Sequence, residues 1–203
     1  VSRLIAKRLG IMYLDAGAMY RAAAFQAKRT GIDFTDGPGL FKMCLELDLR
    51  FLPDAENQKI LLGSEDISSA IRTPEMDMLS SRISAVKEVR DAMTKLQRKI
   101  GKTGSLVAEG RDMGTVVFPD ADYKFFVTAS VTERARRRHL ERLGRGEDLS
   151  IEEVEEDLKI RDAQDSGRAI APLRPAEDAE IIDTTGTGID EVIEGMLKKI
   201  HIY

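Results

Sequence analysis

The sequence is poor in cysteine and histidine, and each shortage argues against a class of structure. Cys44 is the one cysteine among 203 residues, which excludes an intrachain disulfide framework and predicts a reducing, cytoplasmic environment. Its neighbours Phe41 and Met43 are apolar, so the simplest interpretation of Cys44 is a buried apolar side chain rather than a reactive thiol. His139 and His201 lie far apart without a surrounding ligand cluster, so we expect no zinc site.

Long apolar runs and an excess of positive charge are also missing. No segment approaches the roughly 18 consecutive apolar residues of a membrane helix, and charged residues interrupt positions 1–9 too often for a signal peptide. The 31 basic and 35 acidic residues give a net charge of −4, which argues against a general nucleic-acid binder. An apolar fraction of 42% and a charged fraction of 33% are typical of a soluble globular protein, here one domain or one domain with a sizeable insertion.

The first half of the chain alternates between helix-like and strand-like segments. Apolar residues at helical spacing predict that the chain begins inside a helix over 1–9, before a short buried strand over 11–14. Alternating segments separated by turn residues then predict a small antiparallel sheet that interrupts this rhythm as an insertion. The expected elements that follow are a helix over 18–29, a turn at 36–39, a helix over 40–46, strands over 47–51, 59–62 and 65–68 with turn residues Pro53, Asp54 and Asn57, and one helix over 76–100.

The second half returns to strands that alternate with helices. This alternation predicts an α/β fold with a parallel sheet covered by helices on both faces. The strand over 123–128 is expected to be central and buried. The expected elements are a strand over 106–108, a turn over 116–121, the strand over 123–128, a helix capped by Ser130 or Thr132, a helix that begins near Ser150, a strand over 181–183 and an amphipathic helix over 189–200.

Three charged residues follow the apolar strand over 106–108. Glu109, Arg111 and Asp112 lie within four residues, next to Gly110, which allows a tight turn. Open α/β sheets bind their ligands at the carboxyl ends of strands, so these side chains are candidates to converge on a small polar substrate. A solvated turn with an internal salt bridge is an equal alternative from these residues alone.

Other candidates are polar residues on predicted helices. Arg21 follows Tyr20 in the first turn of its helix, where a cation opposes the helix dipole. A solvated surface charge is the simple interpretation, and this mild cost raises the weight of a ligand role above the usual. Ser81 and Arg90 are nine residues apart, so they reach one pocket only if their helix is bent or its first part is separate; ordinary surface positions are the simpler interpretation.

An arginine-rich helix raises three alternatives. A nucleic-acid patch, a solvated face and a phosphate clamp each suit six arginines within twelve residues; the acidic face over 152–157 would pair with most of them across a helical hairpin. Further along, Arg161 and Asp165 are four residues apart and share a helix face, and Arg168 follows them. The six arginines are Arg134, Arg136, Arg137, Arg138, Arg142 and Arg145.

At this point the sequence resembles the bacterial cytidylate kinase family, in the right order along essentially the whole chain. The motifs that carry the resemblance are 14–21 (LDAGAMYR), 71–73 (IRT), the long and specific 109–121 (EGRDMGTVVFPDA), 161–162 (RD) and 168–173 (RAIAPL). The resemblance implies a nucleoside monophosphate kinase fold, with a parallel five-stranded core, a monophosphate-binding insertion over about 40–100 and a lid over about 137–168. It implies transfer of the ATP γ-phosphate to CMP or dCMP with Mg²⁺, in a monomer without nucleic-acid or membrane partners.

The same resemblance implies roles for individual residues, by motif. Ser81, Arg90 and Asp112 would read the cytosine, and Arg21 and Arg111 would hold the α-phosphate. Arg161 and Asp165 would face the sugar, and Arg168 the transferred phosphoryl group. The resemblance also places Asp15, Tyr20 and Glu109 in the substrate site, and Arg137 and Arg138 on the ATP side at the lid.

General chemistry agrees with these implied roles. A carboxylate such as Asp112 accepts from the cytosine N4 amino group, whereas uracil presents an oxygen there. Polar pairing of this kind rejects the wrong base by up to roughly 10⁴. Phosphoryl transfer needs positioning and charge neutralisation more than a covalent nucleophile, and the chain is rich in arginine without a Ser-His or Cys-His arrangement.

Three departures from the family pattern stand out. The phosphate loop, Gly-x-x-x-x-Gly-Lys-Ser/Thr, does not occur in the sequence, so we expect it on a strand and loop before Val1 and expect 1–203 alone to be inactive. Ala16 stands where family members often carry a hydroxyl, and Glu109 where aspartate is more usual. The alternatives are another small P-loop kinase, for UMP, dTMP or a coenzyme precursor, and an RNA-associated regulator that uses the arginine-rich helix.

Overall fold

The structure is a computed structural model that describes residues 1–52, 58–144, 146–168 and 170–201. The predicted turn residues Pro53, Asp54 and Asn57, and also Arg145, lie outside the described residues. The chain divides into two compact units: an N-terminal unit of 6–110 with Ser2, and a C-terminal unit of 111–203 with Val1 and 3–5. Helix α1 (Ser2–Leu9) contributes to both units and confirms the predicted first helix.

The N-terminal unit carries two parallel strands that end side by side. Strand β1 (Met12–Asp15) pairs with β5 (Leu106–Glu109), so that Asp15 is the register partner of Glu109. Helix α2 (Ala16–Thr30) begins directly after β1, two residues earlier than predicted. The reason is that Asp15 caps the helix, its Oδ1 accepting from the Ala18 amide at 2.8 Å.

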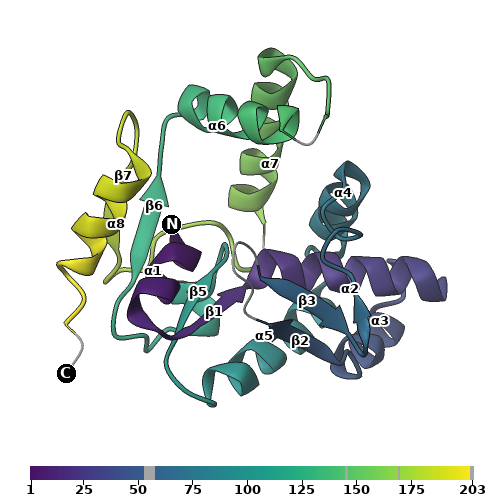
Figure 1. The fold of residues 1–203 in the computed structure, drawn as a ribbon. Helices are drawn as coiled ribbons and strands as arrows, with labels where there is room; N and C mark the ends of the chain where they lie inside the picture. The colour runs from purple at the N-terminus through teal and green to yellow at the C-terminus, as the bar shows by residue number, and fades with distance from the viewer. Residues whose placement is uncertain (53–57, 145, 169, 202–203) are drawn as a thin grey trace. The chain divides into compact units, whose positions relative to one another are not determined.

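The predicted small antiparallel sheet is confirmed in the same unit. Strands β2 (Leu49–Leu52), β3 (Lys59–Leu62) and β4 (Glu65–Asp66) lie in that order in the sheet. Figure 1 shows β2 and β3 side by side. The preceding helix α3 (Gly37–Leu45) includes the residues predicted to form a turn. That turn prediction is wrong because Asp36 caps the Gly39 amide at 3.0 Å and Pro38 is tolerated in a first helical turn.

The single helix predicted over 76–100 is two helices in the structure. Helix α4 (Pro74–Ile83) packs against α2, and α5 (Lys87–Gly101) packs against α3. Residues 84–86 separate the two helices, because Val86 is extended at φ −77° and ψ 121°. The predicted apolar stripe nevertheless forms the core, with Ile83, Val89 and Met93 fully buried.

Cys44 lies in this core, as its apolar neighbours predict. Burial raises the pKa of the Cys44 thiol to about 12, so the thiol is protonated at physiological pH. A buried, protonated thiol is a weak nucleophile, which confirms the apolar interpretation.

The C-terminal unit begins with a π-helical turn, η1 (Met113–Val117), where part of a turn was predicted. Strand β6 (Phe125–Thr128) pairs in parallel with β7 (Glu180–Asp183). The prediction that this strand is central and buried is wrong, since Val127 is 45% exposed and, among the described strands, β6 pairs with β7 alone. Helices α6 (Val131–Leu143) and α7 (Ile151–Gly167) form a hairpin, and α8 (Ile189–Leu197) follows β7 (Figure 1).

The α/β class with parallel strands is thus confirmed. The parallel strands form one pair in each unit, within the residues that the structure describes. The five-stranded core stays a prediction. Across the same described ranges, no helix has the length and apolar character needed to cross a membrane.

Candidate functional site

Two carboxylates stand together where β1 and β5 end. Asp15 and Glu109 are register partners at the carboxyl ends of these parallel strands. Burial raises the pKa of Asp15, the nearby Arg21 charge opposes this rise, and Glu109 adds to it. A second cation, Arg72, lowers the pKa of Asp15 slightly. The strand ends therefore concentrate negative charge that Arg21 and Arg72 partly balance.

Arg21 is confined but poorly satisfied. Its Nη2 lies 3.5 Å from Asp15 Oδ2, and its Nη1 lies 3.7 Å from Asp77 Oδ1. Both separations exceed an ordinary N–H···O distance, so these contacts are ionic rather than hydrogen-bonded. Arg21 Nε is buried without a hydrogen-bond acceptor among the described residues. A guanidinium that lacks a hydrogen-bond acceptor is suited to bind an oxyanion, because the oxyanion supplies that acceptor.

The break between α4 and α5 brings Ser81 and Arg90 into one connected group. Arg90 Nη1 donates to the Ser84 carbonyl at 3.1 Å, and Ser84 Oγ donates to the Ser81 carbonyl at 2.9 Å. The Arg90 guanidinium also lies 5.7 Å from the Tyr20 ring centroid, within cation–π range. Arg90 is 5% exposed, so it is not an ordinary surface residue. The sequence condition for Ser81 and Arg90 to act together, a helix whose first part is separate, is therefore met.

In the C-terminal unit, three arginines gather around Asp165. Arg111 Nε lies 2.8 Å from Asp165 Oδ2, and Arg168 Nη2 lies 2.5 Å from Oδ1. Arg161 Nε stands 4.0 Å from Oδ2, one helical turn away. The Asp165 side chain is 2% exposed, whereas the Arg111 and Arg161 side chains are 46% and 38% exposed. One buried carboxylate therefore anchors three cations, two of which reach solvent.

Asp112 is buried in the same unit and directly precedes η1. It is 4% exposed, and its carbonyl accepts from the amides of Val116 at 2.9 Å and Val117 at 3.2 Å. π-helical turns are rare in proteins, and those that occur are often found at functional sites. These two hydrogen bonds therefore fix the backbone of Asp112, the residue expected to recognise the base.

Most of the arginine-rich helix α6 is paired within its own unit. Arg142 meets Asp157 at 3.3 Å, as predicted for the acidic face over 152–157, whereas Arg134 crosses the α6–α7 hairpin to Asp162, outside that face, at 2.7 Å. Arg136 and Arg137 pair instead with Glu133 on their own helix. Arg138 pairs with Glu141 at 2.9 Å. This internal pairing leaves little of the helix for a nucleic-acid patch.

Arg137 ties α6 to the loop after β7. Its Nη2 donates to the Thr184 carbonyl at 2.7 Å and its Nη1 to Thr184 Oγ1 at 3.0 Å. The guanidinium groups of Arg136 and Arg137 lower the pKa of Glu133 to about 2, so Glu133 is ionised at physiological pH. Arg137 is thus hydrogen-bonded to this loop, although its side chain stays 41% exposed.

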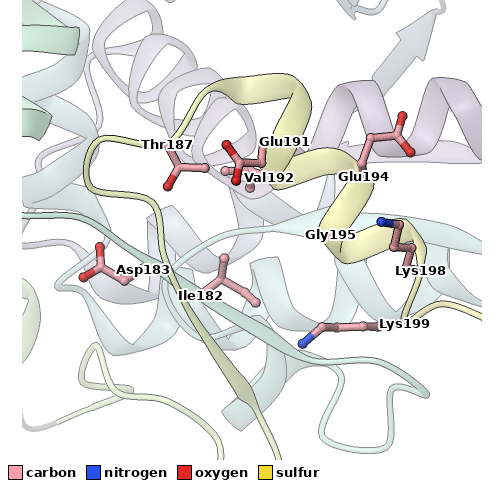
Figure 2. A pocket seen from close by; sticks show the side chains of 9 residues that line it. All are labelled: Ile182, Asp183, Thr187, Glu191, Val192, Glu194, Gly195, Lys198 and Lys199. Carbon is pink, nitrogen blue, oxygen red and sulfur yellow. The ribbon is translucent and has the colours of Figure 1, made fainter.

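A pocket of about 570 Å³ lies against β7 and α8, and it contains none of the predicted site residues (Figure 2). The pocket is largely open to solvent, and this gives no reason to place the candidate site in it. The lining residues are Ile182, Asp183, Thr187, Glu191, Val192, Glu194, Gly195, Lys198 and Lys199.

Comparison with known proteins identifies the family of this chain. The family model described as cytidylate kinase matches residues 1–202. The chain belongs to the cytidylate kinase family. It is 48% identical to a cytidylate kinase of Geobacter sp. (strain M21), over 98% of this chain and 86% of that protein. It is 46% identical to the enzyme of Carboxydothermus hydrogenoformans, over 98% and 90% respectively, and 45% identical to that of Cupriavidus pinatubonensis, over 98% and 88%.

For a cytidylate kinase, the predicted site residues fall into two sets. The N-terminal unit holds Asp15, Tyr20, Arg21, Ser81, Arg90 and Glu109, and the C-terminal unit holds Arg111, Asp112, Arg137, Arg138, Arg161, Asp165 and Arg168. Within each unit the structure connects most of them. The prediction that both sets serve one substrate stays a prediction.

Two polar residues next to these sets were not foreseen. Ser84 was hidden because the break between α4 and α5 was not predicted. Asp77 was hidden because an acid in a first helical turn is ordinary, and only the packing of α4 on α2 brings it to Arg21.

Asp15→Asn is expected to make this family member more stable and less active. A carboxyl whose folded pKa lies above its ordinary 3.8 costs stability when ionised; the cost vanishes below pH 3.8 and grows as pH rises through the folded pKa. Asparagine is uncharged and caps helices equally well. Thermal melts from pH 4.5 to pH 8 should therefore show a gain in Tm that is largest at pH 8.

The matched control is Asp36→Asn, which changes an exposed capping residue on α3. It should leave Tm nearly unchanged across the same pH range. A lower Tm for Asp15→Asn at pH 8 would show that Asp15 stabilises the fold by its charge, contrary to this prediction.

Proposed function

We propose that this chain catalyses transfer of the γ-phosphate of ATP to CMP or dCMP. A phosphate oxygen of the monophosphate forms a bond to the γ-phosphorus, the bond to the bridging oxygen breaks, and ADP leaves with the bonding electrons. The observation that carries the proposal is the cluster of Arg111, Arg161 and Arg168 around buried Asp165, in a member of the cytidylate kinase family. Charge neutralisation by positioned cations is what this reaction requires of a protein.

The arginines divide the phosphates between them in this proposal. Arg111 and Arg21 bind the α-phosphate, because the first has a half-exposed side chain and the second has one donor, Nε, without an acceptor in the described part of the chain. Arg168 faces the transferred phosphoryl group, and Arg161 with Asp165 faces the sugar. Asp165 supports the contacts of Arg111, Arg161 and Arg168 by holding these three arginines in place.

Recognition of the base rests on Ser81, Arg90 and Asp112. Asp112 accepts from cytosine N4, while Arg90 donates to N3 or O2, the acceptors of the same ring. Burial of Arg90 and Asp112 supports this role, since buried polar groups discriminate strongly against a partner that leaves them unpaired.

Mg²⁺ enters this proposal with ATP. Within the described ranges, no group of three or more His, Cys, Asp and Glu side chains is arranged to hold a metal ion. Mg²⁺ commonly binds substrate phosphates with few protein ligands, so the residues present are compatible with a metal carried by the nucleotide. It would neutralise charge on the ATP phosphates.

The remaining parts of the kinase are assigned by family. We propose a monophosphate-binding part over about 40–100, a lid over about 137–168 that contains the α6–α7 hairpin, a five-stranded parallel core and an ATP contact through Arg137 and Arg138. We also propose that the enzyme is a cytoplasmic monomer.

The direct test is a panel of acceptors. Full-length protein, with any residues that precede Val1, is incubated with ATP and Mg²⁺, and ADP formation is followed with CMP, dCMP, UMP, dTMP and AMP. CMP and dCMP should be the best acceptors. Equal rates with AMP, or activity with UMP or dTMP and none with CMP, would refute the proposal in favour of another small kinase.

Asp112→Asn is expected to lower the preference for CMP over UMP by about 10²-fold. The carboxylate accepts only, whereas the amide can donate to the uracil oxygen that replaces N4. The ratio of kcat/KM values for the two acceptors measures this change.

Asp120→Asn is the control, because Asp120 is an exposed acid in the same motif. It should keep the wild-type preference. An unchanged preference in Asp112→Asn would remove Asp112 from base recognition.

A further inference from the structure

Asp77 faces Arg21 from a different helix. Asp77 lies in the first turn of α4, and its Oδ1 is 3.7 Å from Arg21 Nη1. Asp15 lies at the other terminal nitrogen, with Oδ2 3.5 Å from Nη2. The Arg21 guanidinium is therefore held between two carboxylates, one from the end of β1 and one from α4.

The surroundings of Arg21 leave it little freedom. The side chains of Arg21 and Asp77 are each 18% exposed. A Cβ at Gly17 would lie 3.6 Å from Arg21 Nη1 and 3.2 Å from Asp15 Oδ1, so the guanidinium passes close above the backbone at Gly17. The packing of α4 against α2 sets where Asp77 meets Arg21.

We propose that Asp77 is a positioning residue for binding of the monophosphate. It acts through Arg21: its charge keeps Nη1 directed to one side, so that the guanidinium is already oriented when the phosphate arrives. This inference rests on the proposed function, in which Arg21 binds the α-phosphate of CMP. Asp77 itself touches no substrate in the proposal.

The expected effect is on binding rather than on chemistry. An arginine fixed before the ligand arrives loses less side-chain entropy on binding. The contact is ionic and partly exposed, so its loss should weaken binding modestly. We expect Asp77→Ala to raise the KM for CMP about three- to tenfold and to change kcat less than about twofold.

Repulsion between Asp77 and the phosphate would have the opposite effect on the KM for CMP, and this difference distinguishes positioning from repulsion. If Asp77 acted mainly by repelling the phosphate, then its neutralisation would lower the KM for CMP. Asp77→Asn keeps the size of the side chain and removes the charge. The positioning role predicts that Asp77→Asn raises the KM, as Asp77→Ala does.

The matched control is Glu75→Ala. Glu75 is also an acid in the first turn of α4, and it pairs with exposed Lys28 at 2.6 Å instead of with Arg21. Loss of either acid removes a similar interaction with the helix dipole. Glu75→Ala should therefore leave the KM unchanged, and its Tm shows how far α4 tolerates such a loss.

The decisive experiment is a double-mutant cycle in full-length protein. Wild type, Asp77→Ala, Arg21→Ala and the double variant are compared for kcat and KM with CMP, and for CMP dissociation constants by calorimetry. Asp77→Ala should weaken CMP binding about three- to tenfold in the wild-type background and less than about twofold in the Arg21→Ala background.

Each other outcome overturns the inference. Equal effects in both backgrounds show that Asp77 acts without Arg21, and an unchanged or lowered KM shows no positioning. If the wild-type protein binds CMP but forms no ADP, the proposed function is refuted. The CMP dissociation constants of the variants still test the role of Asp77 in that case. Wild type that does not bind CMP refutes both.

Discussion

Asp165→Ala is expected to destabilise the protein by roughly 2–3 kcal/mol and to lower kcat/KM for CMP by about 10²–10³-fold. Removing one partner of a fully buried ion pair costs roughly 3–5 kcal/mol; the expected value is lower because Arg111 and Arg161 can turn toward solvent. In the variant, the three arginine side chains lose the carboxylate that they share. The activity falls because the same carboxylate sets the position of the arginines that bind phosphate.

Urea denaturation and steady-state assays measure the two effects. Asp157→Ala is the matched control, since Asp157 is a 62% exposed acid on the same helix and pairs with Arg142. It should cost less than about 0.5 kcal/mol. If Asp165→Ala were as stable as this control, the buried anchor would have no structural importance.

Arg111→Ala is expected to lower kcat/KM by about 10²–10³-fold without unfolding the protein. A cation aimed at transferring or adjacent phosphate oxygens supplies transition-state stabilisation of this order. The fold should persist because the Arg111 side chain is 46% exposed and Arg168 still pairs with Asp165 at 2.5 Å. Steady-state kinetics with CMP and a thermal melt test the two parts.

Arg29→Ala is a suitable control. Arg29 is a 42% exposed arginine that pairs with Glu65. It should retain nearly full activity. A collapse of Tm in Arg111→Ala would make Arg111 structural, and unchanged turnover would remove it from the phosphate site.

The sequence predicted local structure well where one local interaction decides it. Of the two expected caps, Ser130 and Thr132, Ser130 caps α6. Helix α7 begins after Ser150, where a helix start was expected, and Ser150 caps it in a full capping box. Gly31 ends α2 with a positive φ of 71°. The amphipathic stripe of α8 buries Val192, Ile193 and Met196, as its spacing indicates.

The sequence failed where local signals compete. Apolar spacing continues through residues 84–86, so periodicity alone predicted one helix where an extended Val86 makes two. Glycine and proline at 37–39 indicated a turn, yet a capping aspartate made them the first turn of α3. β6 was predicted to be central and buried from its composition, but burial depends on which elements cover a strand, and Val127 is 45% exposed.

The charged motif after β5 shows the same division. By itself the sequence determined the residue types, the i,i+4 relation of Arg161 and Asp165 and the family, because these depend on order along the chain. Only the tertiary structure decided that Arg111 and Arg168 meet on a buried Asp165, and that Asp77 meets Arg21. Arg111 and Asp165 are 54 residues apart, and no local pattern encodes a contact that arises from packing between elements.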